Sequence, residues 1–76
     1  MVPAKTNGKW RALVTGELNH SFKSVPAALM FSGFKREVRR DNSPSNINRL
    51  IDKAYIFFIK YEALLVRDIR EIFKQE

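Results

Sequence analysis

The predicted fold class depends on residues 10–25, which read WRALVTGELNHSFKSV. In residues 10–15 the even positions form one apolar face, a period of two that is typical of a β-strand. Residues 16–19 carry turn-forming side chains, and residues 18–25 then alternate again. The stretch therefore predicts a β-hairpin.

A helix is expected to cover this hairpin, because two strands alone are not stable in water. Ser24 is suited to cap such a helix, and Pro26 fits its first turn, where a missing N–H costs nothing. The apolar side chains that follow recur at helical spacing and form one stripe. They are Ala27, Met30, Phe31, Phe34 and Val38.

A second, longer helix is predicted after the breaker at residues 41–46, DNSPSN. Either Ser43, with Pro44 at the first helical position, or Ser45 can cap it, and no further Gly or Pro occurs up to Lys74. Such a helix would be about 45 Å long, longer than the compact part of so small a domain. An apolar surface on a helix of that length indicates self-association or a bound partner. The residues expected at this dimer or partner interface are Ile56, Phe57, Phe58, Ile59, Tyr61, Leu64 and Leu65.

The predicted architecture is therefore α+β, an N-terminal β-hairpin covered by a short helix and followed by a long C-terminal amphipathic helix. The 76 residues form one domain, since a chain of this length has room for a single core. Its predicted parts are a flexible arm at 1–8, a basic hairpin–helix module at 9–40 and the long helix at 44–75.

The amino-acid composition limits where the protein is expected to be located and which disulfide, metal and cofactor chemistry it is expected to have. The chain has no cysteine, so disulfides and thiolate metal sites are excluded, and no cofactor is expected. Residues 1–7 contain no apolar run of the kind found in signal peptides. The most apolar stretch, residues 55–59, is soon interrupted by Lys60 and Glu62, so no membrane span is expected. These features favour a cytoplasmic protein.

The positive charge is concentrated in the first part of the chain. Residues 1–40 contain eight Lys and Arg against two Glu, a net charge of +6, whereas residues 41–76 contain six of each sign. This asymmetry predicts contact with a polyanion on one side of the molecule and packing or assembly on the other.

A basic cluster on the shorter helix is the strongest functional feature. Its spacings of one, three, four and five residues place four cations on one exposed side, and phosphate is the commonest counter-ion for such a group. The alternative is a solvated surface near a helix C-terminus, where cations interact favourably with the helix dipole. The four residues are Lys35, Arg36, Arg39 and Arg40.

The hairpin is expected to add further contacts to DNA. A two-stranded ribbon fits the major groove, where Lys and Arg side chains read base edges. Lys9, Arg11 and Lys23 belong to this arm and ribbon. An ordinary solvent-facing surface is about as good an explanation of their positions.

One short pattern runs through the same residues. It consists of NGKWRALV at 7–14, SFKS at 21–24 and the alanines at 27–28, with a helix continuing to Arg40. This rhythm resembles the arm-type, or AP2-like, DNA-binding domains of phage integrases. In that family a sheet lies in the major groove and a helix packs behind it. The resemblance implies that Lys9, Arg11 and Lys23 face the DNA.

Catalysis is not expected. His20 is the only histidine, so no Cys–His pair and no conventional zinc site can form. A Ser-His-Asp set can be counted but no spacing favours it, and no phosphate-binding glycine loop is present. A small basic ribonuclease of toxin type, acting through Arg and Lys, is the one enzymatic alternative that the composition leaves open.

The predicted function is a small DNA-binding accessory or regulatory protein of phage or mobile-element type that acts as a homodimer, with RNA as another possible target. The alternative is an inhibitor or adaptor that docks on a host protein through its apolar helix or its basic patch. Both hypotheses use the same charged residues, so the sequence does not separate them.

Overall fold

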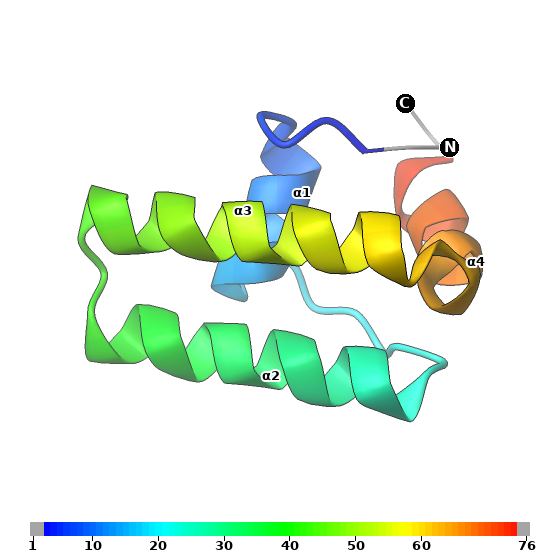
Figure 1. The fold of residues 1–76 in the computed structure, drawn as a ribbon, viewed down its shortest axis with the longest axis horizontal. Coiled ribbons are helices and arrows are strands. Elements are labelled where there is room, and N and C mark those ends of the chain that lie inside the picture. Colours follow the sequence, from blue (N-terminus) through cyan, green and yellow to red (C-terminus); the bar gives the residue numbers. More distant parts are fainter. Residues whose placement is uncertain (1–2, 75–76) are drawn as a thin grey trace.

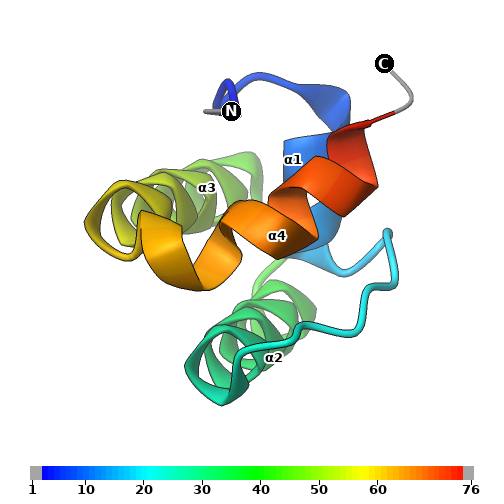
Figure 2. The ribbon, with the colours of Figure 1, turned by 90° about the vertical axis from the view of Figure 1, so that its right-hand side faces the viewer.

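The structure of the protein is a computed structural model that describes residues 3–74. Over this range the chain forms four α-helices and no strand (Figure 1). They are α1 (Gly8–Thr15), α2 (Val25–Arg40), α3 (Pro44–Lys60) and α4 (Glu62–Phe73). Helices α2 and α3 run antiparallel, and α1 and α4 lie on one side of this pair (Figures 1 and 2). Within the described residues, the other side of the pair has no covering element.

The predicted α+β class is wrong, because the stretch expected to be the first strand forms helix α1. Its buried side chains, Trp10, Leu13 and Val14, are spaced three and four residues apart, so the same short stretch fits a helical period as well as an alternating one. Asn7 starts the helix, since its Oδ1 accepts a hydrogen bond of 2.8 Å from the N–H of Lys9.

Helix α1 ends at Gly16, whose φ of 87° lies in the left-handed region that glycine adopts without steric cost. Beyond it, the N–H of Leu18 donates to the carbonyl of Ala12 at 3.0 Å and closes the chain reversal. The turn predicted at residues 16–19 is therefore present, but it terminates a helix instead of joining two strands.

The segment predicted as the second strand, residues 18–25, forms no strand, since residues 18–24 are irregular and Val25 begins α2. Its alternation does produce an inward side, since Leu18 and Phe22 pack against the core. The ring of Phe22 stacks on Phe31 of α2 with 4.6 Å between centroids. A strand needs a neighbouring strand to accept and donate its backbone hydrogen bonds, and this segment packs on helices. No ladder forms for that reason.

The single long helix predicted over residues 44–75 is also wrong. The helix is interrupted at Tyr61, where φ of −123° and ψ of 41° depart from helical geometry. After the break α4 turns back and buries Leu65, Ile69 and Phe73 in the core. A straight helix of about 45 Å would carry these side chains beyond a molecule whose longest extent is 30 Å.

The predicted starts of the two longer helices are confirmed. The hydroxyl of Ser24 accepts a hydrogen bond of 3.4 Å from the N–H of Ala27, and Ser43 does the same for Asn46 at 3.4 Å. Each helix has a proline in its first turn. These two capping patterns set where α2 and α3 start, the helices that form the candidate site.

The core is centred on Trp10, which is fully buried. Its indole makes edge-to-face contacts with Phe31 of α2 and Phe58 of α3, at centroid distances of 6.0 and 6.1 Å. Aromatic pairs in this arrangement add to the stabilisation that burial supplies. Because α1 contributes the central residue, it fixes how α2 and α3 lie against one another.

The N-terminal segment lies against α3. The ammonium of Lys5 is 3.4 Å from a carboxylate oxygen of Asp52 and 5.6 Å from the ring centroid of Tyr55. Residues 1–2 of the predicted arm and residue 75 of the predicted long helix lie outside the described residues. No helix of residues 3–74 is long and apolar enough to cross a bilayer.

Candidate functional site

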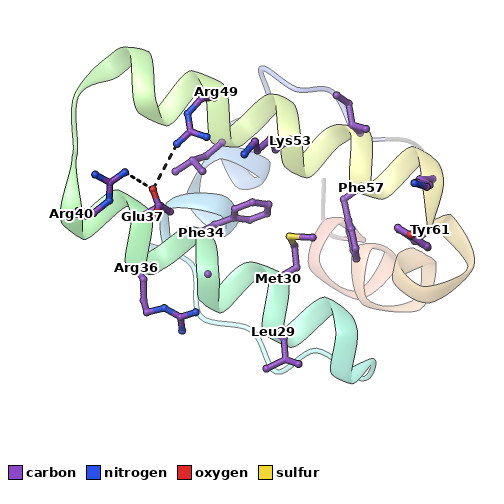
Figure 3. A pocket seen from close by; sticks show the side chains of 14 residues that line it. Leu29, Met30, Phe34, Arg36, Glu37, Arg40, Arg49, Lys53, Phe57 and Tyr61 are labelled. Atoms are coloured by element: carbon purple, nitrogen blue, oxygen red, sulfur yellow. Dashed lines mark hydrogen bonds and ion pairs between the residues drawn. The ribbon is translucent and has the colours of Figure 1, made fainter.

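An open groove runs between α2 and α3 on the uncovered side of the pair (Figure 3). Because the two helices are antiparallel, the C-terminal half of α2 faces the N-terminal half of α3. The two ends of this α2–α3 groove differ in chemistry. The basic end is lined by Arg36, Arg40, Arg49 and Lys53, and the apolar end by Leu29, Met30, Ile56, Phe57 and Tyr61, with one cation, Lys60, beside Tyr61.

The apolar end exposes large hydrophobic side chains on both walls. On α2, Leu29 is 68% exposed and Met30 is 37% exposed, and on α3 Ile56 is 63% exposed. Tyr61, at the break between α3 and α4, is 41% exposed. Figure 3 shows Met30 and Phe57 extending into the groove from opposite helices. Large apolar side chains that remain open to water on both helices of a groove are typical of a surface that binds a partner.

The basic end contains the only carboxylate among the residues that line the groove, Glu37. Its Oε2 accepts a hydrogen bond of 2.7 Å from Arg40 and lies 3.7 Å from Nη2 of Arg49 (Figure 3). The hydrogen bond from Arg40, together with its charge, lowers the pKa of Glu37 below the ordinary value. With Lys60 included, the lining has five cations and one anion, so the groove is positively charged.

Asn46 holds Arg49 at the basic end. Its Nδ2 donates to the backbone carbonyls of Asp41 at 2.7 Å and Glu37 at 3.3 Å, near the C-terminus of α2. Its Oδ1 accepts a hydrogen bond of 2.7 Å from Nη2 of Arg49. Asn46 is buried, and these bonds pair both polar atoms of its side chain. One side chain thus joins the two walls and orients an arginine.

Of the four residues in the predicted basic cluster of α2, two line the groove and two do not. Arg36 and Arg40 line the groove. Arg39 is exposed but does not belong to the lining. Lys35 extends toward the turn after α1, where a Cβ added to Gly16 would lie 2.8 Å from its Cγ. Half of the cluster therefore belongs to the groove.

The other three basic residues predicted to contact DNA contribute nothing to the groove lining. The Nζ of Lys9 donates to the carbonyl of Ile72 at 3.3 Å, near the end of α4. Arg11 lines a separate hollow with residues of α3. Lys23 lies in the irregular segment, and its backbone N–H donates to Asp68 at 3.2 Å. The ribbon that was expected to gather these side chains is not formed.

The predicted apolar interface is similarly divided. Ile56, Ile59, Tyr61 and Leu64 are exposed, with exposed fractions of 63%, 60%, 41% and 41%. The remaining three residues, Phe57, Phe58 and Leu65, are buried in the core of the same chain. Of the exposed four, only Ile56 and Tyr61 line the groove.

Sequence reasoning missed Leu29, Met30, Arg49 and Lys53 as site residues. The apolar stripe predicts Met30 as a core residue of α2, and no pattern in the sequence singles out Leu29. A signal was present, since Arg49, Lys53 and Ile56 recur at spacings of four and three and so share one side of α3. The sequence does not show that α2 lies beside this side of α3, so it does not identify these residues as one wall of a groove.

A buried carboxylate lies away from the groove. Asp68 of α4 is fully buried, and its Oδ1 is 3.1 Å from Nε2 of His20. The same oxygen accepts the N–H of Lys23, so Asp68 fastens the segment between α1 and α2 to α4. We assign the pair a structural role. Among residues 3–74 no group of three or more His, Asp or Glu side chains is placed to hold a metal ion.

Comparisons with protein-family models, curated proteins and solved structures found no match to this chain. The α2–α3 groove is therefore interpreted from its own geometry and charge.

Proposed function

We propose that this protein binds a partner protein through the α2–α3 groove and acts as an adaptor or inhibitor. One observation carries this proposal: Leu29 of α2 and Ile56 of α3, which both line the groove, are both more than 60% exposed. Covering such side chains is favourable only when the partner also buries apolar surface. A protein segment offers that surface together with polar groups for the basic end.

The basic end supports a partner with negative charge. Positive potential over the groove accelerates encounter with an acidic segment and disfavours basic ones. The apolar end would supply most of the affinity, and the arginines would supply selectivity and orientation. This division matches the separation of the two chemistries along the groove.

DNA or RNA binding remains a prediction that rests on charge alone. Phosphates could neutralise Arg36 and Arg40, but they would leave Leu29 and Ile56 open to water. The integrase-like rhythm of residues 7–40 adds no support, because the sheet that it implies is not formed by the described residues. We keep a cytoplasmic location within the proposal, on the cysteine-free composition only.

Two matched pairs of variants test the proposal. Ile56→Asp and Ile59→Asp place the same charge at similarly exposed positions of one helix, but only Ile56 lines the groove. Arg36→Ala and Arg39→Ala remove one exposed cation each from α2, and only Arg36 lines it. Circular dichroism would confirm that all four variants fold.

The wild-type protein would be used to select binders from a displayed peptide library, and mixed-sequence duplex DNA would be titrated in parallel. The proposal expects binders that are lost with Ile56→Asp and retained with Ile59→Asp. It is overturned if Ile56→Asp changes nothing while Arg36→Ala weakens DNA binding and reduces its salt slope by about one.

A further inference from the structure

We infer that the groove takes up a short amphipathic helix whose carboxylates and apolar anchors share one side and lie two to three turns apart. This inference rests on the proposed function, since it concerns the occupant of the same groove.

The walls favour a helical occupant over an extended one. Both are α-helices, so their backbone N–H and carbonyl groups are already paired within each helix. Residues 3–74 contain no strand edge to which an extended peptide could add. An extended segment would lie in the groove with its own backbone groups unpaired, whereas a helix satisfies them internally. A third helix also packs readily between the side-chain ridges of two neighbouring helices.

The spacing of the two ends sets the pattern on the occupant. Along α2, Leu29 precedes Arg36 by seven residues and Arg40 by eleven, which corresponds to about 10 and 16 Å. On α3 the order is reversed in sequence but the same in space, with Arg49 seven residues before Ile56. A helix lying along the groove therefore needs its carboxylates about seven to eleven residues from its apolar anchors.

A second copy of this chain fits the groove less well than an acidic helix. A two-fold dimer applies one surface to itself. With the axis along the groove, the arginines of one basic end would face those of the other. With the axis across the groove, charged side chains would cover the apolar end. Both arrangements leave charges without counter-ions, whereas an acidic segment supplies them.

The test uses three labelled peptides of about 18 residues, each long enough to form five helical turns. A segregated peptide carries Glu in one half and Leu or Phe at i, i+3, i+4 spacing in the other half. A mixed peptide has the same composition with Glu and apolar residues interleaved along one side. A charge-swapped peptide has Lys in place of Glu. Binding is measured by fluorescence anisotropy, with duplex DNA and vesicles of phosphatidylcholine and phosphatidylserine as parallel ligands.

The expected result is that the segregated peptide binds at least about tenfold more tightly than the mixed one and that the charge-swapped peptide does not bind. Ile56→Asp should abolish this binding, while Ile59→Asp should preserve it. Equal binding of the segregated and mixed peptides would overturn the inference about spacing and leave the proposed function standing.

Other outcomes would overturn both proposals. The first is binding of DNA or vesicles, but of no peptide. The second is failure of all the ligands to bind. A third is a dimer in solution that dissociates with Ile56→Asp and excludes the peptides, since it would identify a second copy as the occupant of the groove.

Discussion

The carboxylate of Glu37 accepts a hydrogen bond of 2.7 Å from Arg40, three residues further along α2. The same oxygen lies 3.7 Å from Nη2 of Arg49 on the facing wall. Glu37 thus stands between two arginines in the place that a partner carboxylate would take. A bound acidic segment has to compete with this internal counter-ion, and that competition can be measured.

Replacing Glu37 by Gln should strengthen binding of the segregated peptide. The change frees both arginines for the partner, so we expect an affinity increase of about three- to tenfold and a steeper dependence on salt. Anisotropy titrations at two NaCl concentrations measure both. Glu17→Gln is the matched control, since it makes the same change in net charge at an exposed position outside the groove lining. Unchanged or weaker binding by Glu37→Gln would contradict the role given to this carboxylate.

Acidification should weaken the fold below about pH 4, where lowered carboxyl pKa values are reached. The hydrogen bond from Arg40 lowers the pKa of Glu37, and the backbone N–H of Ser43 lowers the pKa of Asp41. A carboxylate with a lowered pKa in the folded state stabilises the fold above its unfolded pKa. That stabilisation is lost as pH falls through the folded value.

Urea midpoints measured at pH 7, 5 and 3 should therefore fall mainly between the last two values. The fall should be smaller in Glu37→Gln, which has one fewer such carboxylate. A midpoint that rises between pH 5 and pH 3 is incompatible with these pKa directions.

Asp68→Ala should destabilise the fold by about 2–3 kcal/mol, because it leaves a partly buried backbone N–H and a histidine without their acceptor. The partners concerned are the N–H of Lys23 and Nε2 of His20. Asp68→Asn should recover part of the loss, since its side-chain oxygen can still accept one bond. Asp52→Ala, at an exposed position on α3, should cost less than about 0.5 kcal/mol. The free energies of unfolding are measured by urea denaturation. Equal values for Asp68→Ala and Asp52→Ala would contradict the structural role assigned to Asp68.

Alanine should have opposite effects at two glycines. Gly16→Ala should destabilise by about 1–2 kcal/mol, because φ is 87° there and the new Cβ would lie 2.8 Å from Cγ of Lys35. Gly33→Ala should stabilise α2 by up to about 1 kcal/mol, since the nearest atom to its Cβ is 3.9 Å away. Thermal melts of the two variants should shift in opposite directions. A shift of both in the same direction would contradict this reading of the two positions.

Local capping signals predicted the starts of α2 and α3 correctly. The hydroxyls of Ser24 and Ser43 each accept a hydrogen bond from the N–H three residues further along the same helix, so the interaction is local in sequence. The stretch after Asn7 was ambiguous, since six residues can satisfy a period of two and a helical period at once. The break at Tyr61 could not be predicted from sequence, because neither Gly nor Pro marks it and it arises from the packing of α4 on the core.

Single residues of the candidate site could likewise be predicted from the sequence, but their arrangement in one groove could not. Arg36 and Arg40 were predicted as exposed cations, and Ile56 was predicted as an exposed apolar residue. Their position in one groove depends on the reversal at residues 41–43, which brings α3 back beside α2. Phe58 belongs to the predicted dimer interface, but it lies in the core of the same chain, against Trp10 of α1. The break at Tyr61 allows the chain to bury its own apolar side chains.

The most direct measurement is a titration of ¹⁵N-labelled protein with the segregated peptide, followed by NMR. If the α2–α3 groove is the binding surface, the largest amide shifts should lie in residues 29–40 and 49–61, and the residues of α1 should change little. Shifts centred on Lys9, Arg11 and Lys23, or no shifts at a saturating peptide concentration, would contradict binding in the groove.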